Sequence, residues 1–158
     1  MHVERTERLW MWAATGMLAL FCGAIVATAV GGSAHPPSHT ETVNPETLSV
    51  QGEFATPGVA SAADGAVTVS MRAEFYVFRP AVVRVPAGVP VTFRITSPDV
   101  LHGFQIVGTN VNLTVAPGYV SQATTTFDTP GEYLVVCNEY CGLAHHLMQG
   151  TVIVEPGR

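Results

Sequence analysis

Lysine is absent from this sequence, and charged residues make up only 12% of its 158 positions. Arginine and acidic residues together leave a formal net charge of −5, and we expect no nucleic acid partner for such a chain. The haem-attachment pattern Cys-x-x-Cys-His is also missing. Hydrophobic residues, in contrast, reach 47%, and together with so few charges this makes the chain too apolar for an ordinary soluble domain.

The apolar excess is concentrated near the N-terminus. No charged residue occurs over residues 9–30, a length that can cross a hydrocarbon core of about 30 Å at about 1.5 Å per helical residue. Trp10 and Trp12 stand where interfacial aromatic residues belong. A cleaved secretory signal is the alternative, since Ala27-Thr28-Ala29 resembles a cleavage site, but signal cores are usually only about 7 to 15 residues long. We therefore predict a retained transmembrane helix over this range, in which Cys22 is simply an apolar side chain.

The arginines beside this span predict its orientation. Arg5 and Arg8 precede it, and the next basic residue is Arg72. Because basic flanks stay on the cytoplasmic side, we expect residues 1–8 to form a cytoplasmic tail. The large C-terminal part of the chain would then lie on the outer side of the cell membrane.

Residues 31–65 are rich in Gly, Pro, Ser, Thr and Ala and show no sustained helical or strand period. We interpret them as a linker with at most a short helical turn over Pro45–Leu48. His35 and His39 could be taken as a metal-binding pair. In a loop of Pro and Ser, however, histidines are more often merely solvated, and we assign them no role.

Residues 66–158 show short strands separated by turns. Val91, Phe93 and Ile95 alternate with Thr92 and Arg94, a period of two that predicts one buried face. The expected strands are Val67–Met71, Glu74–Phe78, Val82–Val85, Val89–Ile95, Phe104–Val107, Val111–Val115, Tyr119–Phe127, Glu132–Val136 and Gly150–Glu155. Short strands without an amphipathic helix favour an all-β fold, either an antiparallel sandwich or a Greek-key barrel.

One stretch, CNEYCGLAHHLM over residues 137–148, gathers most of the metal-binding side chains of the chain. It holds Cys137, Cys141, His145, His146 and Met148, and such soft sulfur ligands beside imidazole suit copper or zinc better than calcium or magnesium. A disulfide between the two cysteines is the structural alternative for an exported domain. A bare disulfide would give no reason for histidine and methionine to follow at these offsets.

The presence of two cysteines in one loop bears on the number of metal ions. A single-copper electron-transfer site uses one Cys, two His and a weak axial Met. Two thiolates can instead bridge two copper ions, and each copper is then completed by one His and one weaker ligand. That stoichiometry asks for a second histidine from elsewhere, and His102, in SPDVLHGF over residues 97–104, is a candidate.

Together, SPDVLHGF and CNEYCGLAHHLM resemble subunit II of haem-copper cytochrome c oxidases, in the small single-span form of ba3-like enzymes. The resemblance covers roughly residues 74–155 and includes the membrane span. It implies a cupredoxin fold for residues 66–158, with the ligand loop joining the last two strands. It also implies the following ligands of a binuclear copper centre called CuA: Cys137 and Cys141 as bridging thiolates, His102 and His145 as nitrogen ligands, Met148 as a weak thioether ligand and the carbonyl of Glu139 as a weak oxygen ligand.

The resemblance implies that this chain is the electron-entry subunit of a respiratory oxidase. Cytochrome c or a similar donor would reduce the copper pair. The electrons would pass to haem in subunit I, where oxygen reduction is coupled to proton translocation. Subunit I, further small subunits and membrane lipid are the expected partners. Three other classes share part of the pattern, namely a free-standing membrane-anchored copper carrier, the CuA domain of nitrous-oxide reductase and a copper-delivery protein of the Cys-x3-Cys type.

Several residues near the predicted site have alternative interpretations. The carboxylate of Glu139 is a candidate ligand for magnesium shared with subunit I, as in larger oxidases. His146 is expected to point outward. The aromatic residues Phe75, Tyr76 and Phe78 fit the core, the electron entry or the subunit interface, and we favour the core. The acidic residues Asp99, Asp128 and Glu132 could form a docking patch for a basic donor or be ordinary loop residues.

Overall fold

The computed structural model describes residues 4–30, 41–62 and 65–157. Contacts divide the chain into two compact units, Met1–His39 and Thr40–Arg158, and each is described by itself. The histidines at 35 and 39 that the sequence raised as a metal pair lie outside the described residues.

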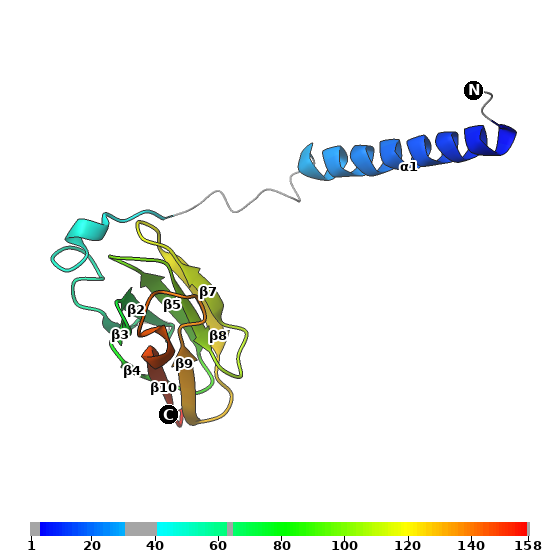
Figure 1. Cartoon of the computed structure of the whole chain (residues 1–158). Coiled ribbons are helices and arrows are strands. Elements are labelled where there is room, and N and C mark those ends of the chain that lie inside the picture. The colour runs from blue at the N-terminus through cyan, green and yellow to red at the C-terminus, as the bar shows by residue number, and fades with distance from the viewer. Residues whose placement is uncertain (1–3, 31–40, 63–64, 158) are drawn as a thin grey trace. The chain divides into compact units, whose positions relative to one another are not determined.

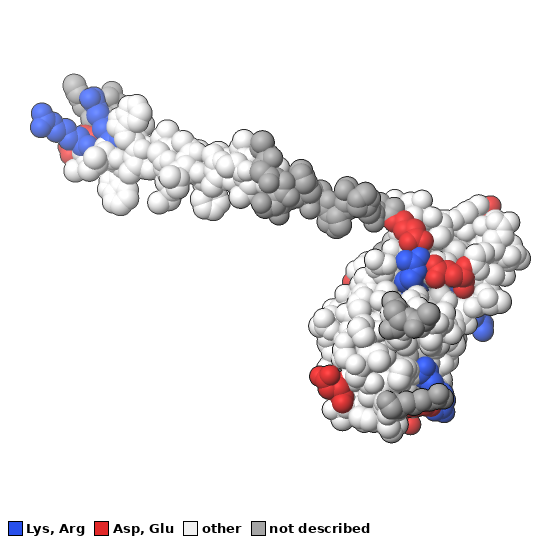
Figure 2. Space-filling model, turned by 180° about the vertical axis from the view of Figure 1, so that it is seen from behind, with Lys and Arg blue, Asp and Glu red and all other residues white. Residues whose placement is uncertain are grey.

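The first unit contains one long helix, α1 (Arg5–Val30). Its segment Arg5–Ala29 is long and apolar enough to cross a membrane, and its side-chain hydroxyls bond to the helix backbone, as Thr15 Oγ1 does to Met11 O at 2.8 Å. Charged atoms gather at one end of the helix and leave the rest of its described surface uncharged (Figure 2). The helix begins at Arg5, a few residues before the predicted span, because the charged residues ahead of position 9 form its first turn.

The second unit is a sandwich of two five-stranded sheets (Figure 1). In one sheet the order is β1-β2-β5-β8 with β3 beside β2, and in the other it is β4-β10-β9-β6-β7. The strands of the first sheet are β1 (Gly58–Ser61), β2 (Val67–Glu74), β3 (Val77–Arg79), β5 (Pro90–Thr96) and β8 (Ser121–Thr126). Those of the second are β4 (Val82–Pro86), β6 (His102–Ile106), β7 (Asn112–Val115), β9 (Gly131–Val136) and β10 (Gln149–Glu155).

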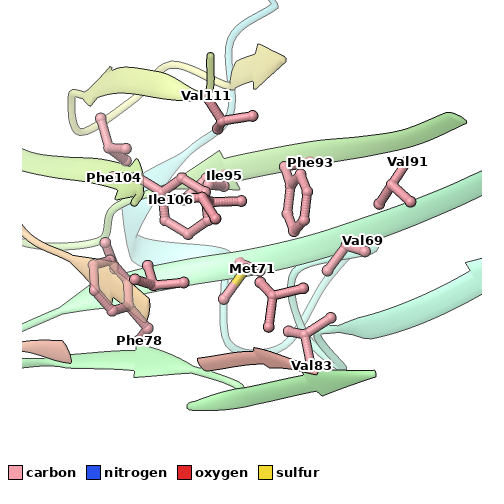
Figure 3. Packing of buried hydrophobic residues seen from close by; sticks show 14 of the residues in the cluster. Val69, Met71, Phe78, Val83, Val91, Phe93, Ile95, Phe104, Ile106 and Val111 are labelled. Atoms are coloured by element: carbon pink, nitrogen blue, oxygen red, sulfur yellow. The ribbon is translucent and has the colours of Figure 1, made fainter. Parts of the chain in front are cut away.

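The core lies between the sheets and follows the predicted alternation along β5. Val91, Phe93 and Ile95 are fully buried, and Figure 3 shows them beside side chains from the opposite sheet. Phe104 of β6 contacts Phe93 at a ring distance of 5.7 Å and Phe78 at 5.5 Å. Burial of each such ring stabilises the fold by about 1.5 to 3 kcal/mol. This packing gives β6, which begins at His102, a rigid base.

Part of the predicted linker belongs to the folded domain. The short turn is confirmed as a 3-10 helix at Pro45–Thr47, but β1 was not foreseen, and it pairs with β2. Leu48 and Phe54 are buried. Isolated small and apolar residues in a Gly- and Pro-rich stretch show no period, so the sequence could not reveal this docking.

Arg94 of β5 fastens the same stretch to the sheet. Its guanidinium bonds to Glu41 and Glu53, each at 2.7 Å, and to Gln122 at 3.0 Å. The pKa of Arg94 is raised, first by the Glu53 bond and then by the Glu41 bond. The predicted strand Tyr119–Phe127 is shortened to β8, since the backbone next to it bonds to residues 41–43 instead.

The predicted strand Glu74–Phe78 is wrong. The chain stays in β2 through Glu74, reverses at Phe75 and Tyr76, and returns as β3. Tyr76 has φ 66°, a left-handed conformation that ends a strand. Residues of high strand propensity occupy this turn, which is why the pattern concealed it.

Candidate metal centre

The ligand loop connects β9 to β10, two strands that lie side by side in Figure 1. Cys137 follows β9 directly, and Met148 directly precedes β10. The Cys137 N–H donates to Met148 O at 3.3 Å, so the ends of the loop are held together by the sheet. A short 3-10 helix, His145–Leu147, turns the chain back toward the core.

Within this loop the candidate ligand atoms converge. Cys141 Sγ lies 3.8 Å from Cys137 Sγ, 3.7 Å from His145 Nδ1 and 3.8 Å from Met148 Sδ. The Glu139 carbonyl accepts from the Cys137 thiol at 3.2 Å. No disulfide joins the two cysteines. Cys137, Cys141 and Met148 are buried, so the three sulfur atoms lie in the interior of the domain.

His102 reaches this cluster from the neighbouring strand. β6 pairs with β9, with Gln105 opposite Val136, and this register places the start of β6 against the start of the ligand loop. The ligand atoms of His102, Cys137 and Cys141 all lie within 4.8 Å of one another. His102 is fully buried, and its Nδ1 has no hydrogen-bond partner. A buried nitrogen left unpaired is costly, and a metal ion bound there would satisfy it.

Asp99 holds the other nitrogen of that ring. Asp99 Oδ1 lies 2.8 Å from His102 Nε2, and its carboxylate also accepts from the backbone N–H groups of Val100 and Phe75, each at 2.6 Å. Burial raises the pKa of Asp99, but the hydrogen bonds from His102, Val100, Phe75 and Ser97 outweigh it and lower that pKa. The ionised carboxylate thus fixes the ring so that Nδ1 is left for a metal.

This role of Asp99 was not foreseen. The sequence alone indicates a docking or loop residue, whereas the side chain is only 17% exposed. Its position three residues before His102 in a turn was the available clue, since histidine ligands usually donate their second nitrogen to a carboxylate or carbonyl.

We expect Asp99→Ala to weaken copper binding by about 10-fold to 100-fold, the usual effect of losing such a partner. The measurement is competition between the purified full chain and a copper chelator of known affinity. Asp128→Ala is the matched control, because Asp128 is an exposed loop acid. Equal affinities for the two variants would contradict a positioning role for Asp99.

Gly103 allows the two segments to meet. A Cβ at this position would stand 2.7 Å from the backbone nitrogens of both Asn138 and Glu139 and would also collide with the Asn138 side chain. Without it, the Gly103 N–H donates to Cys137 Sγ at 3.4 Å. Such a bond would stabilise a thiolate in a place where water cannot.

The Cys141 thiol is protonated at neutral pH. Burial raises the pKa of Cys141 to about 11, with a further increase from its hydrogen bond to Cys137. Because metals bind the thiolate, binding has to displace this proton.

Copper uptake is therefore expected to weaken as the pH falls. Each thiol proton released lowers the apparent affinity about tenfold per pH unit below its pKa. The measurement is a Cu(I) titration of the reduced, metal-free chain against a chelator between about pH 6 and pH 8. An affinity that does not change with pH, after correction for the chelator, would contradict the protonated state.

The remaining predicted residues are placed as follows. His146 is exposed on the 3-10 helix, and His145 is half-buried, with the tilted ring of Tyr140 at a centroid distance of 5.8 Å. Of the three aromatic residues assigned to the core, Phe78 is buried, but Phe75 is 51% exposed. The side chain of Tyr76 is half-buried.

The donor set fits copper on chemical grounds. Two buried thiols, two imidazoles and a thioether are soft or borderline ligands, and they outnumber the one hard donor, a backbone carbonyl. Such a set selects copper, zinc or iron-sulfur clusters over magnesium, calcium or manganese. The unpaired Nδ1 of His102 is the one buried histidine nitrogen without a partner in the described part of the chain.

Comparison with known proteins identifies the family. A model described as "Cytochrome C oxidase subunit II, periplasmic domain" matches residues 68–155. A cytochrome c oxidase subunit 2 of Thermus thermophilus is 40% identical over 153 residues, which cover 94% of this chain and 91% of that protein. Another subunit 2 from the same species is 43% identical over 122 residues, or 76% of this chain and 90% of that one.

Solved structures agree. A chain from a haem-copper terminal oxidase dimer, determined by cryo-EM, superposes with a TM-score of 0.59 at 32% identity and covers 96% of this chain and 100% of its own. The periplasmic domain of cytochrome oxidase subunit II from Bradyrhizobium japonicum shares the fold, with a TM-score of 0.52 at 16% identity over 64% of this chain and 88% of that one. The predicted cupredoxin-like β fold behind an N-terminal helix is thereby confirmed, and the chain belongs to the cytochrome c oxidase subunit II family.

Proposed function

We propose that this chain is the electron-entry subunit of a haem-copper oxidase and that it holds a binuclear copper centre. Cys137 and Cys141 would bridge the two ions, and His102 and His145 would each bind one. Met148 and the carbonyl of Glu139 would be the weak ligands. When bound, such a copper pair supplies a one-electron relay between an external donor and the haem of subunit I.

One observation carries this proposal. His102, Cys137 and Cys141 offer ligand atoms within 4.8 Å of one another, and the buried Nδ1 of His102 faces no other partner among the described residues. A single copper needs only one thiolate. The second buried thiol lies 3.8 Å from the first, which supports two ions that share both sulfurs.

The protein contributes rigidly held ligands and the exclusion of water to electron transfer. β9 and β10 hold both ends of the ligand loop, and β6 with its packed Phe104 holds His102. Asp99 keeps the imidazole of His102 in one orientation. When ligands cannot rearrange between oxidation states, the reorganisation barrier stays low. The buried sulfurs also exclude water, which would otherwise reorient at each electron step.

The expected arrangement in the membrane places Arg5 and Arg8 in the cytoplasm and the copper domain outside. Subunit I, further small subunits and lipid would surround α1. The electron donor would be cytochrome c or a similar protein. Asp99 is committed to His102, so only Asp128 and Glu132 of the proposed acidic patch remain exposed. Charged side chains on the face seen in Figure 2 are few and of mixed sign.

The competing classes predict a different fold or different partner proteins. A copper-delivery protein with a thioredoxin-like fold would place helices between its strands, whereas α1 is the only α-helix among the described residues. A free-standing carrier would have the same copper loop but no obligatory partner. Affinity purification of the tagged full chain from its own membranes separates these classes, because only an oxidase subunit brings a haem-containing subunit with it.

The deciding experiment is a copper count combined with electron paramagnetic resonance of the full chain in detergent. Two coppers per chain, with hyperfine lines showing one unpaired electron shared over two nuclei, would support the proposal. One copper with a single-nucleus pattern, or a disulfide without copper, would overturn the binuclear centre.

Magnesium is a separate proposal about the carboxylate of Glu139. That side chain is half-buried and makes no hydrogen bond or ion pair within the described ranges, so it is available to an ion shared with subunit I. Glu139→Gln should then lower the magnesium content of the whole complex by about one ion, while the Glu139 carbonyl still serves copper. Unchanged magnesium in the variant complex would remove the proposal.

A further inference from the structure

The two-residue turn between β2 and β3 contacts both arms of the metal centre. One arm is His102 at the start of β6, and the other is the segment of the ligand loop from Cys141 to His145. On one side, the Phe75 N–H donates to Asp99 Oδ2 at 2.6 Å, and Asp99 Oδ1 bonds to His102. On the other side, the ring of Tyr76 lies against Gly142, the residue after Cys141. This turn is distant from both ligand segments in the sequence, and it is not part of the ligand set.

The contact between Tyr76 and Gly142 is close. A Cβ built on Gly142 would stand 2.7 Å from the Tyr76 hydroxyl oxygen and 3.2 and 3.4 Å from two ring carbons. Gly142 itself has φ 131°, and its carbonyl accepts the N–H of His145 at 3.1 Å. The tyrosine ring thus contacts the segment that joins Cys141 to His145.

Tyr76 adopts this place at a conformational cost. Its φ of 66° makes it the only non-glycine residue with positive φ in the described ranges. This region suits Gly or Asn at such a turn position and disfavours an aromatic residue. Unfavourable backbone conformations persist only where the surroundings impose them, and they gather at functional sites. Here the surroundings are the Asp99 bond and the packing of the ring.

We infer that Tyr76 is a positioning residue for the metal centre. Its ring packs against the segment from Cys141 to His145 and fixes the position of that segment relative to His102. The Phe75 N–H, through Asp99, ties the same turn to the His102 ring. The spacing between the two arms is then set by one rigid hairpin. This inference rests on the proposed copper-binding function of the site.

One substitution separates the ring contact from backbone strain. Tyr76→Asn removes the ring but retains a residue that tolerates positive φ, so relief of the backbone strain should offset part of the packing lost against the core, and the metal-free chain should still unfold cooperatively. Copper should nevertheless be lost to a chelator about ten times faster, and the copper hyperfine pattern should change. A variant with unchanged hyperfine pattern and unchanged copper loss would overturn the inference.

A double-mutant cycle tests the contact itself. Gly142→Ala introduces the clash with the Tyr76 hydroxyl, whereas Tyr76→Phe removes that oxygen and keeps the ring. The strain of alanine at φ 131° is common to both backgrounds, so it cancels in the cycle. We expect Gly142→Ala to accelerate copper loss several-fold less in the Tyr76→Phe background. Strictly additive effects on copper loss and on the spectrum would contradict a direct contact.

The unmodified full chain, in detergent, is measured in the same experiment. If it failed to bind two coppers, the proposed function would fail and this inference with it. If it bound two coppers with the shared-electron spectrum while the Tyr76 variants behaved identically to it, only the positioning role would be lost.

Discussion

Replacing Cys141 with serine is expected to leave the purified oxidase with about 1% or less of its donor-oxidation rate, a larger loss than the 10-fold to 100-fold typical of supporting residues. Cys141 Sγ lies within 3.8 Å of the ligand atoms of Cys137, His145 and Met148. A serine hydroxyl stays protonated at neutral pH and is a hard ligand, so it cannot bridge two copper ions.

The measurement is donor oxidation by the whole complex, together with its copper content. Copper at the site should fall from two ions to at most one, and the shared-electron spectrum should disappear. Cys22→Ser is the matched control, because Cys22 is an exposed residue of α1. A Cys141→Ser complex that kept both coppers and most of its activity would rule out the bridging role.

Replacing Gly103 with alanine is expected to damage the site without touching any ligand. The new Cβ would stand 2.7 Å from the backbone nitrogens of Asn138 and Glu139. Those atoms cannot rotate away as a side chain could, so the ligand loop has to move off β6. We expect about 1 to 3 kcal/mol lower stability, the usual cost of overpacking, and a copper affinity lower by at least about tenfold, since His102 and Cys137 are pushed apart.

Thermal unfolding of the metal-free chain and chelator competition of the loaded chain measure these two effects. Gly58→Ala in β1 is the matched control, because a Cβ there meets nothing within 4 Å. If Gly103→Ala bound copper as tightly as the control variant does, the close approach of β6 and the ligand loop would be wrong.

Much of this protein could be predicted from local sequence. The uncharged stretch at residues 9–30 predicted a helix, because membrane-spanning length and apolar composition are local properties. Most strands were predicted because burial on one face of a strand leaves a period of two, as along β5. Cys137, Cys141, His145 and Met148 could be grouped because they lie within one loop.

Other features depended on contacts between distant segments. The docking of residues 41–61 rests on Leu48, Phe54 and the Arg94 ion pairs, none of which has a local pattern. Tyr76 was assigned to a strand because aromatic residues favour strands, and only the hairpin revealed its turn.

The metal centre shows the same division. Residue chemistry and family resemblance supplied the list of candidate ligands, but spacing alone could not show that His102 approaches Cys137 and Cys141. The register of β6 against β9 brings them together, and the absence of a side chain at Gly103 permits the approach. The roles of Asp99 and Tyr76 likewise arise only in the folded chain, because hydrogen bonds and packing between segments far apart in sequence are fixed by the tertiary structure.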